Sequence, residues 1–104
     1  MKPLILDDEA DGEYRHAVGV YASENLAVAV RFTERLEEAL ERIAAEPHIW
    51  PLAPGVHEHL GVRKYRIDRF PYSVLFVELA TEVRILAFAH GKRKPGYWLR
   101  RVPQ

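Results

Sequence analysis

The chain has 104 residues, which suits one domain over residues 1–104 and leaves no room for a second. Hydrophobic residues make up 48% of the sequence and cysteine is absent, so a core can form without disulfides, and thiolate metal sites and cysteine nucleophiles are excluded. No apolar run approaches the roughly 20 residues that span a bilayer, and the first residues do not resemble a signal peptide. We therefore expect a soluble cytoplasmic protein that makes no contact with a membrane.

The net charge of zero conceals two halves of opposite sign. Residues 1–61 hold five Lys/Arg and twelve Asp/Glu, whereas residues 62–104 hold ten and three, so the halves carry net charges of −7 and +7. One interpretation is a basic face for nucleic acid or an acidic partner. The other is that the two halves neutralise each other within the fold. Both remain open at this point.

The first half of the chain predicts a short strand and two helices. The strand lies within residues 2–8, where Asp7 or Asp8 is placed to cap the helix that follows. Apolar residues recur every three to four positions in residues 9–25 and again in residues 26–47, where Pro47 ends the second helix. Asn25 is expected to separate the helices and to cap the second one. A link this short implies an antiparallel helical hairpin.

The second half predicts a proline-rich loop and three strands. The loop covers residues 46–61, and its Trp50 is expected to pack across the sheet or the hairpin. Residues 62–68 alternate in side-chain character, residues 72–79 are apolar on both faces, and residues 82–90 end at His90. By simple alternation, His90 shares a face with Arg84, Leu86 and Phe88. Short links between the strands predict an antiparallel meander.

The order β-α-α-β-β-β defines the expected fold class. It is an α+β domain in which the helical hairpin packs on one face of a twisted antiparallel sheet.

Cations and aromatic residues gather at the meander and just after it. Phosphate recognition needs several cations on a rigid support, and contact with bases needs planar side chains that stack. The candidate basic patch comprises Arg63, Lys64, Arg66, Arg69, Lys92, Arg93, Lys94, Tyr97 and Trp98. The alternative is a set of ordinary surface cations, with Tyr97 and Trp98 folded back onto the sheet.

The histidines are compatible with two kinds of chemistry. His90, Arg93 and Tyr97 have the side chains of an acid–base set for RNA cleavage, although a histidine at a strand end is as often structural. His48 and the His-x-His pair of His57 and His59 lie in the loop as possible zinc ligands. No cysteine completes a set and the acidic candidate, Glu58, would point the other way, so solvated loop histidines are the simpler interpretation. We therefore expect no metal and no cofactor.

Three segments resemble the RelE/ParE superfamily of type II toxin–antitoxin toxins. The first is the helical hairpin, and the second is "GVRKYRIDRFPYSVLF" at residues 61–76. The third is "VRILAFAHGKRKPGYW" at residues 83–98, which is similar to the family's closing strand, its His-x-x-Arg and its aromatic end. In the hairpin, the residues spaced as in ParE-like members are Tyr21, Ala27, Arg31, Phe32, Leu36, Ala39, Ile43 and Pro47.

The resemblance implies the same fold, a partner and one of two activities. The partner is a cognate antitoxin, whose acidic or amphipathic C-terminal segment commonly wraps the toxin and covers its basic surface. RelE-like members cleave mRNA on the ribosome, and such chemistry would fall to Arg66, His90, Arg93 and Tyr97. ParE-like members inhibit DNA gyrase without nuclease chemistry. A third hypothesis is a non-toxic binding module that only pairs with an antitoxin-like partner.

Ser73 favours the ParE-like branch. Ribonuclease members typically carry an arginine just after the aromatic residue that opens the second meander strand, and here that position is Ser73, after Tyr72. Loss of one oxyanion-stabilising donor commonly costs about 2.7–4 kcal/mol of transition-state stabilisation. The two-helix start of the chain points the same way, so gyrase binding is the favoured activity and mRNA cleavage the alternative.

Overall fold

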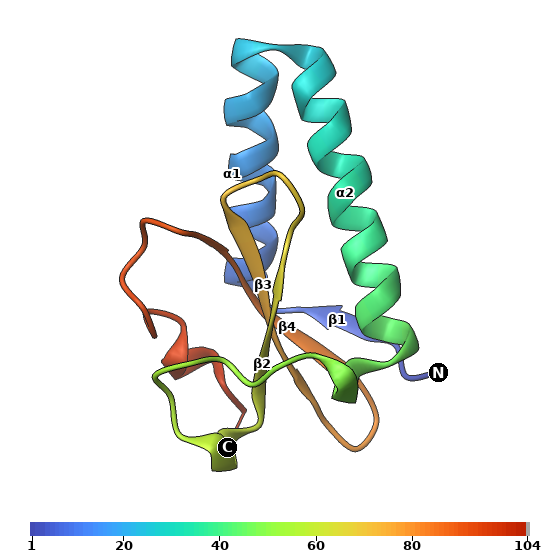
Figure 1. Cartoon of the computed structure of the whole chain (residues 1–104), viewed down its shortest axis with the longest axis vertical. Helices are drawn as coiled ribbons and strands as arrows, with labels where there is room; N and C mark the ends of the chain where they lie inside the picture. The colour runs from blue at the N-terminus through green and yellow to red at the C-terminus, as the bar shows by residue number, and fades with distance from the viewer. Residues whose placement is uncertain (104) are drawn as a thin grey trace.

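A helical hairpin covers one face of a four-stranded sheet in the computed structural model, which describes residues 1–103 and leaves Gln104 outside (Figure 1). The longer elements, in chain order, are β1 (Leu4–Leu6), α1 (Asp8–Glu24), α2 (Leu26–Ala45), β2 (Val62–Arg66), β3 (Tyr72–Glu78) and β4 (Val83–His90). Three short 3-10 helices are η1 (Pro47–Ile49), η2 (Glu58–Leu60) and η3 (Leu99–Arg101). Among these residues, no helix is long and apolar enough to cross a membrane.

Polar side chains begin both long helices where the sequence predicts. The side chain of Asp7 accepts a hydrogen bond from the Glu9 amide at 2.9 Å. The side chain of Asn25 accepts from the amides of Ala27 and Val28, at 2.9 and 3.4 Å, and its own amide donates to the Tyr21 carbonyl. A single residue therefore ends α1 and starts α2, which confirms the antiparallel hairpin.

The hairpin packs on the sheet through an apolar and aromatic core. The buried stripe of α2 is the predicted one, comprising Ala29, Phe32, Leu36, Ala39 and Ile43. At the upper end, Phe32 lies between Tyr21 of α1 and Phe70 of the β2–β3 turn, with ring centroids 5.0 and 5.1 Å away. Aromatic contacts in such tilted and edge-on geometries add to the burial of the rings. The core therefore joins both helices to the β2–β3 hairpin.

The sheet is mixed rather than wholly antiparallel. Its strand order is β1-β4-β3-β2, and β2, β3 and β4 form the predicted antiparallel meander. The correction concerns β1, which pairs with β4 in parallel, with Leu4 opposite Val83. Parallel neighbours need a long crossover connection. Here the helical hairpin and the rest of the meander lie between the two strands in the chain.

A β-bulge in β4 changes which side chains share a face. Leu75 lies opposite Ala87 and Phe76 lies opposite Ile85, so Leu86 has no partner of its own. Leu86 and Ala87 both join the core on the face away from the helices, whereas Ile85 and Phe88 join the core beneath the helices. The expectation that Arg84 and Leu86 share the face of His90 is therefore wrong, because one extra residue reverses the alternation.

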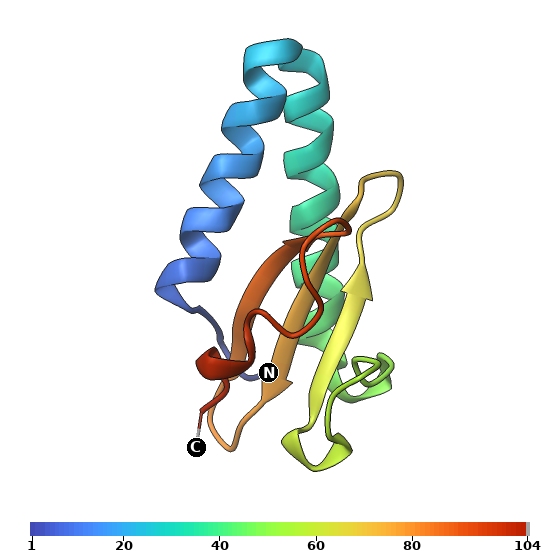
Figure 2. The same ribbon diagram turned by 90° about the vertical axis from the view of Figure 1, so that its left-hand side faces the viewer.

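The segment after β4 folds back over the second face of the sheet (Figure 2). Trp98, which is 4% exposed, packs there with Leu75, Leu86 and other apolar side chains. The loop before β2 runs along that strand's outer edge, since the Ala53 amide donates to the Val62 carbonyl. In the same loop Trp50 packs edge-on against Tyr65, with ring centroids 4.6 Å apart, as expected. β3 is therefore covered on both faces, as its sequence predicts.

Replacing Asn25 with alanine tests whether this residue holds the hairpin. Asn25→Ala removes the acceptor for two amides at the start of α2, and we expect the free energy of unfolding to fall by about 1 kcal/mol. Asn25→Asp is the matched control, since a carboxylate accepts the same hydrogen bonds, and it is expected to stay close to the parent. Chemical denaturation followed by circular dichroism measures both. Equal losses in the two variants would contradict the capping role.

Candidate functional site

The carboxylate of Glu13, on α1, gathers the C-terminal segment against the sheet. The Tyr97 hydroxyl donates to its Oε2 at 2.6 Å, and Nη1 of Arg101 donates to its Oε1 at 2.9 Å. The backbone amide of Phe88 also donates to Oε1, at 3.1 Å. Nη1 of Arg93 lies 4.0 Å from Oε2. One side chain therefore accepts hydrogen bonds from β4 and from two residues beyond it, and Arg93 adds a longer ion pair.

These contacts complete an edge of β4 that β1 leaves open. β1 is three residues long and pairs only with Val83 to Ile85. Beyond it, the Leu86 carbonyl accepts from Nη1 of Arg101 at 3.0 Å, and the Phe88 amide is taken by Glu13. Unpaired backbone groups at a buried edge are costly. A guanidinium and a carboxylate therefore occupy the place of the missing strand.

The Glu13 contacts are largely withdrawn from solvent. The side chain of Arg101 is 6% exposed and that of Glu13 is 15% exposed. Burial alone lowers the pKa of the Arg101 guanidinium, but the hydrogen bond and charge of Glu13, with Glu9, outweigh it and leave this pKa raised. Burial also raises the pKa of the Tyr97 phenol, and the Glu13 carboxylate adds to that shift. Tyr97 is therefore a neutral donor committed to Glu13.

Ion pairs between the tail and α1 neutralise part of the opposite charge of the two halves of the chain. Arg100 and Arg101 both reach Glu9, at 2.5 and 3.1 Å, in addition to the contacts at Glu13. The two halves of the chain therefore neutralise each other here, as the second interpretation of the asymmetry proposed.

A cleft of about 380 Å³ lies beside the tail, on the sheet face away from the helices. Its floor contains Ser73 and Leu75 of β3 and Ala89 of β4, and two loops form its walls. The lining residues are Ala53, Pro54, Gly55, Lys64, Ser73, Leu75, Ala89, His90, Gly91, Arg93, Lys94, Pro95, Gly96, Tyr97 and Trp98. The lining is thus mostly apolar and carries the cations Lys64, Arg93 and Lys94. None of the described residues that line it is an aspartate or a glutamate.

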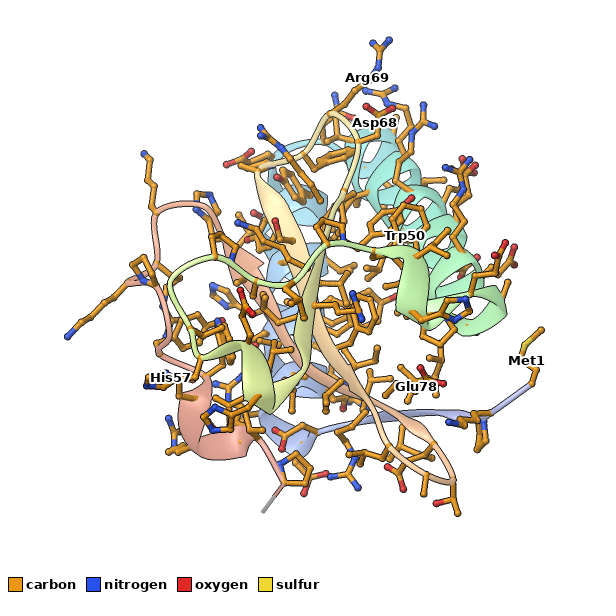
Figure 3. The ribbon with its side chains drawn as sticks, turned by 60° about the horizontal axis from the view of Figure 1, so that its bottom comes forward. Met1, Trp50, His57, Asp68, Arg69 and Glu78 are labelled. Carbon is orange, nitrogen blue, oxygen red and sulfur yellow. The ribbon has the colours of Figure 1, made fainter. Side chains whose placement is uncertain are left out.

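The predicted basic patch is divided among several surfaces. Lys64, Arg93 and Lys94 meet at the cleft, and Lys92 is exposed nearby in the loop after β4. Arg63 lies on the opposite face of β2, where Nη1 donates to the Trp50 carbonyl at 2.6 Å. Arg69 stands at the far end of the β2–β3 turn, well away from the tail (Figure 3). The nine residues therefore do not form one patch.

Trp98 must be removed from the patch. Its side chain is buried in the second core, so the alternative that it folds back onto the sheet is the one observed. Tyr97 lines the cleft, but its ring lies under the Arg93 guanidinium, 3.8 Å from the ring centroid. Neither aromatic residue presents a free face for stacking.

The predicted acid–base set is brought together only in part. Arg93 and Tyr97 line the cleft and His90 borders it, but the His90 ring lies toward the helix side of the sheet, in a hollow with Tyr72 and Phe88. Arg66 is opposite Ser73 on the neighbouring strand and lines an adjacent hollow with Trp50 and Tyr65. The His90 ring packs edge-on against Tyr72, and its Nδ1 accepts from the Lys92 amide at 3.0 Å. His90, Arg93 and Tyr97 each already have a partner within the chain.

The residues that organise the site were not among the predicted ones. Glu13 and Arg101 lie far apart in the sequence, and each looks like an ordinary surface charge on its own. The only signal was the opposite charge of the two halves. No group of three or more histidine or acidic side chains is arranged to hold a metal ion within residues 1–103, and the rings of His57 and His59 are 5.4 Å apart.

Fold and sequence comparisons agree on the class of protein. Nine solved chains match this one in fold, among them one from "Chromosomal ParDE TA system from P. aeruginosa". That chain is 19% identical, with a TM-score of 0.73, and the match covers 86% of this chain and 96% of the other. The family described as "ParE toxin of type II toxin-antitoxin system, parDE" matches residues 4–95. This chain therefore belongs to the ParE toxin family. A search of curated proteins finds no match.

Replacing Glu13 tests the role of the buried carboxylate. Glu13→Ala leaves the Arg101 guanidinium and the Phe88 amide without their acceptor, and we expect the free energy of unfolding to fall by about 3–5 kcal/mol. Glu9→Ala is the matched control from the same face of α1. Its carboxylate is 49% exposed, so a loss within about 1 kcal/mol is expected. Denaturant titration distinguishes them, and comparable losses would refute the assignment.

Proposed function

We propose that this protein is a growth-inhibiting toxin that acts by binding DNA gyrase, without catalysis, and that a cognate antitoxin neutralises it. Membership in the ParE toxin family supports the toxin role. The structural neighbour described as a ParDE system supports an antitoxin partner for this chain. We expect the protein to act in the cytoplasm and without a cofactor.

The state of Tyr97 is the observation that carries the choice against catalysis. A general acid in RNA cleavage must give its proton to the leaving oxygen. The Tyr97 proton is instead donated to Glu13 at 2.6 Å, and burial together with that carboxylate raises the pKa of the phenol. Ser73 supplies no cation to the cleft, and Arg66, opposite Ser73 on β2, borders the cleft without lining it. A binding mode of inhibition is therefore the better fit.

The ribosome-dependent ribonuclease remains the second candidate because Arg93 and Tyr97 share one cleft, which His90 borders. For it to act, the ribosome or the message would have to draw Tyr97 away from Glu13. The third candidate, a non-toxic module that pairs with an antitoxin-like partner, uses the same fold but predicts no effect on growth.

Induction of the protein alone in bacteria tests the proposal. We expect growth arrest, filamentation and induction of the DNA-damage response, with translation continuing at first. Pulse labelling of new DNA and new protein shows which synthesis fails first, and co-expression of the antitoxin is expected to restore growth.

The alternatives give different results in the same strain. Prompt loss of translation with intact DNA, together with new 5′ ends on messages by primer extension, would replace gyrase binding with mRNA cleavage. Normal growth with folded protein present would leave only the non-toxic module. The Tyr97→Phe variant is the internal control and is expected to keep toxicity if no proton transfer is involved. Because it also removes a donor from Glu13, its fold and stability are checked by circular dichroism.

A further inference from the structure

Two matching turns form the walls of the cleft beside the tail. One contains Pro54 and Gly55, and the other contains Pro95 and Gly96. Both glycines adopt left-handed backbone conformations, with φ of 77° and 80°, which side chains other than glycine rarely adopt. The proline before each glycine has its own φ fixed by its ring. The walls are thus held in place by local backbone constraints, and a ligand meets a cleft that is already formed.

The floor and the rim of this cleft differ in chemistry. The floor is apolar apart from the Ser73 hydroxyl, with Leu75, Ala89 and the edge of Trp98 contributing. The rim carries Lys64 from β2 and Lys94 from the loop after β4. Neither lysine lies within 4.0 Å of a carboxylate in residues 1–103, unlike Arg93, which approaches Glu13. Within that range, two lysines without an ion-pair partner therefore flank an apolar hollow, and Arg66 lies beside Lys64 on the same face of β2.

We propose that this cleft is an anchor site for one apolar side chain of an acidic protein segment. The side chain fills the hollow over Leu75 and Ala89, and carboxylates before and after it pair with Lys64 and Lys94. Pockets of about 300–1,000 Å³ with apolar walls and a few placed polar groups are typical binding sites. Interfaces are dominated by a few such buried anchors. The inference rests on the proposed antitoxin partner and names the chemistry by which it is held.

The cleft suits a peptide better than RNA. Recognition of single-stranded RNA depends on aromatic faces that stack on the bases. The two aromatic residues of the cleft do not offer such faces, since Trp98 is 4% exposed and a guanidinium covers the Tyr97 ring. An aliphatic or aromatic side chain needs only the apolar floor, which is present.

Titration of the full chain with short synthetic peptides tests the anchor. The probe Ac-EEFEE-NH2 is added to ¹⁵N-labelled protein, and backbone and indole resonances are followed by NMR. We expect shifts at Ser73, Ala89, Gly96 and Trp98, and an affinity roughly tenfold or more above that of Ac-EEAEE-NH2, because burial of the phenyl ring provides the difference. Ac-KKFKK-NH2 is expected to bind more weakly than the acidic probe.

Two lysines of one loop provide a matched pair of variants. Lys94 lines the cleft and Lys92 does not, although both are exposed and lie two positions apart. Lys94→Glu is expected to weaken binding of Ac-EEFEE-NH2 at least roughly threefold, whereas Lys92→Glu leaves it within error. Ser73→Trp fills the floor and is expected to abolish the advantage of phenylalanine over alanine. The spectrum of each variant shows whether it is folded.

Three results would overturn the anchor site. They are equal affinity for the phenylalanine and alanine peptides, shifts confined to the helical hairpin, and tighter binding of a trinucleotide RNA to the same resonances. None of these depends on toxicity. Growth arrest without peptide binding would refute the anchor site and leave the proposed toxin function standing. Peptide binding without growth arrest would refute the toxin function and leave the anchor site standing.

Discussion

The fold depends on how the open edge of β4 is closed. β1 is too short to pair beyond Ile85, so the rest of that edge would face α1 with its backbone groups unpaired. Glu13 and Arg101 supply the missing acceptor and donor. Glu13 comes from α1 and Arg101 from the end of the chain. The hydrogen bonds that complete the edge of β4 therefore also hold the tail in place. Once the tail is fixed, Trp98 is carried over the second face of the sheet, where it completes a core. The cleft beside it exists because the tail passes there.

The same interactions that shape the cleft restrict its chemistry. A buried ion pair adds little net stability, since desolvation offsets its attraction, but it fixes geometry because breaking it is costly. Here that geometry places Tyr97 and Arg93 at the cleft while committing the phenol to Glu13 and laying the guanidinium on the ring. The side chains of Tyr97 and Arg93 therefore make contacts that hold the tail in place. The rest of the cleft offers apolar surface and the cations Lys64 and Lys94, with Arg66 beside them on β2.

The sequence predicts the parts of this fold that local rules determine. The helical hairpin follows from apolar periodicity, the Asn25 cap and Pro47, and the meander follows from short links. Long-range features cannot be predicted from these local rules. The three residues of β1 do not indicate the direction of the strand, and nothing in the sequence around Leu86 indicates the bulge that reverses the alternation of side chains. The contact between Glu13 and Arg101 joins residues 88 positions apart, so only the charge imbalance hinted at it.

That imbalance has a more specific meaning once the internal pairs are known. Arg100 and Arg101 are taken up by Glu9 and Glu13, so the excess positive charge of the second half does not all reach a partner. Among residues 1–103, the cations without an ion-pair partner at and beside the cleft include Lys64 and Lys94 and, opposite Ser73 on β2, Arg66, and together their charge attracts an acidic segment. Charge of this kind speeds encounter and selects acidic partners, but specificity must come from shape. In this chain the shape available for that purpose is the apolar hollow between the two Pro-Gly turns.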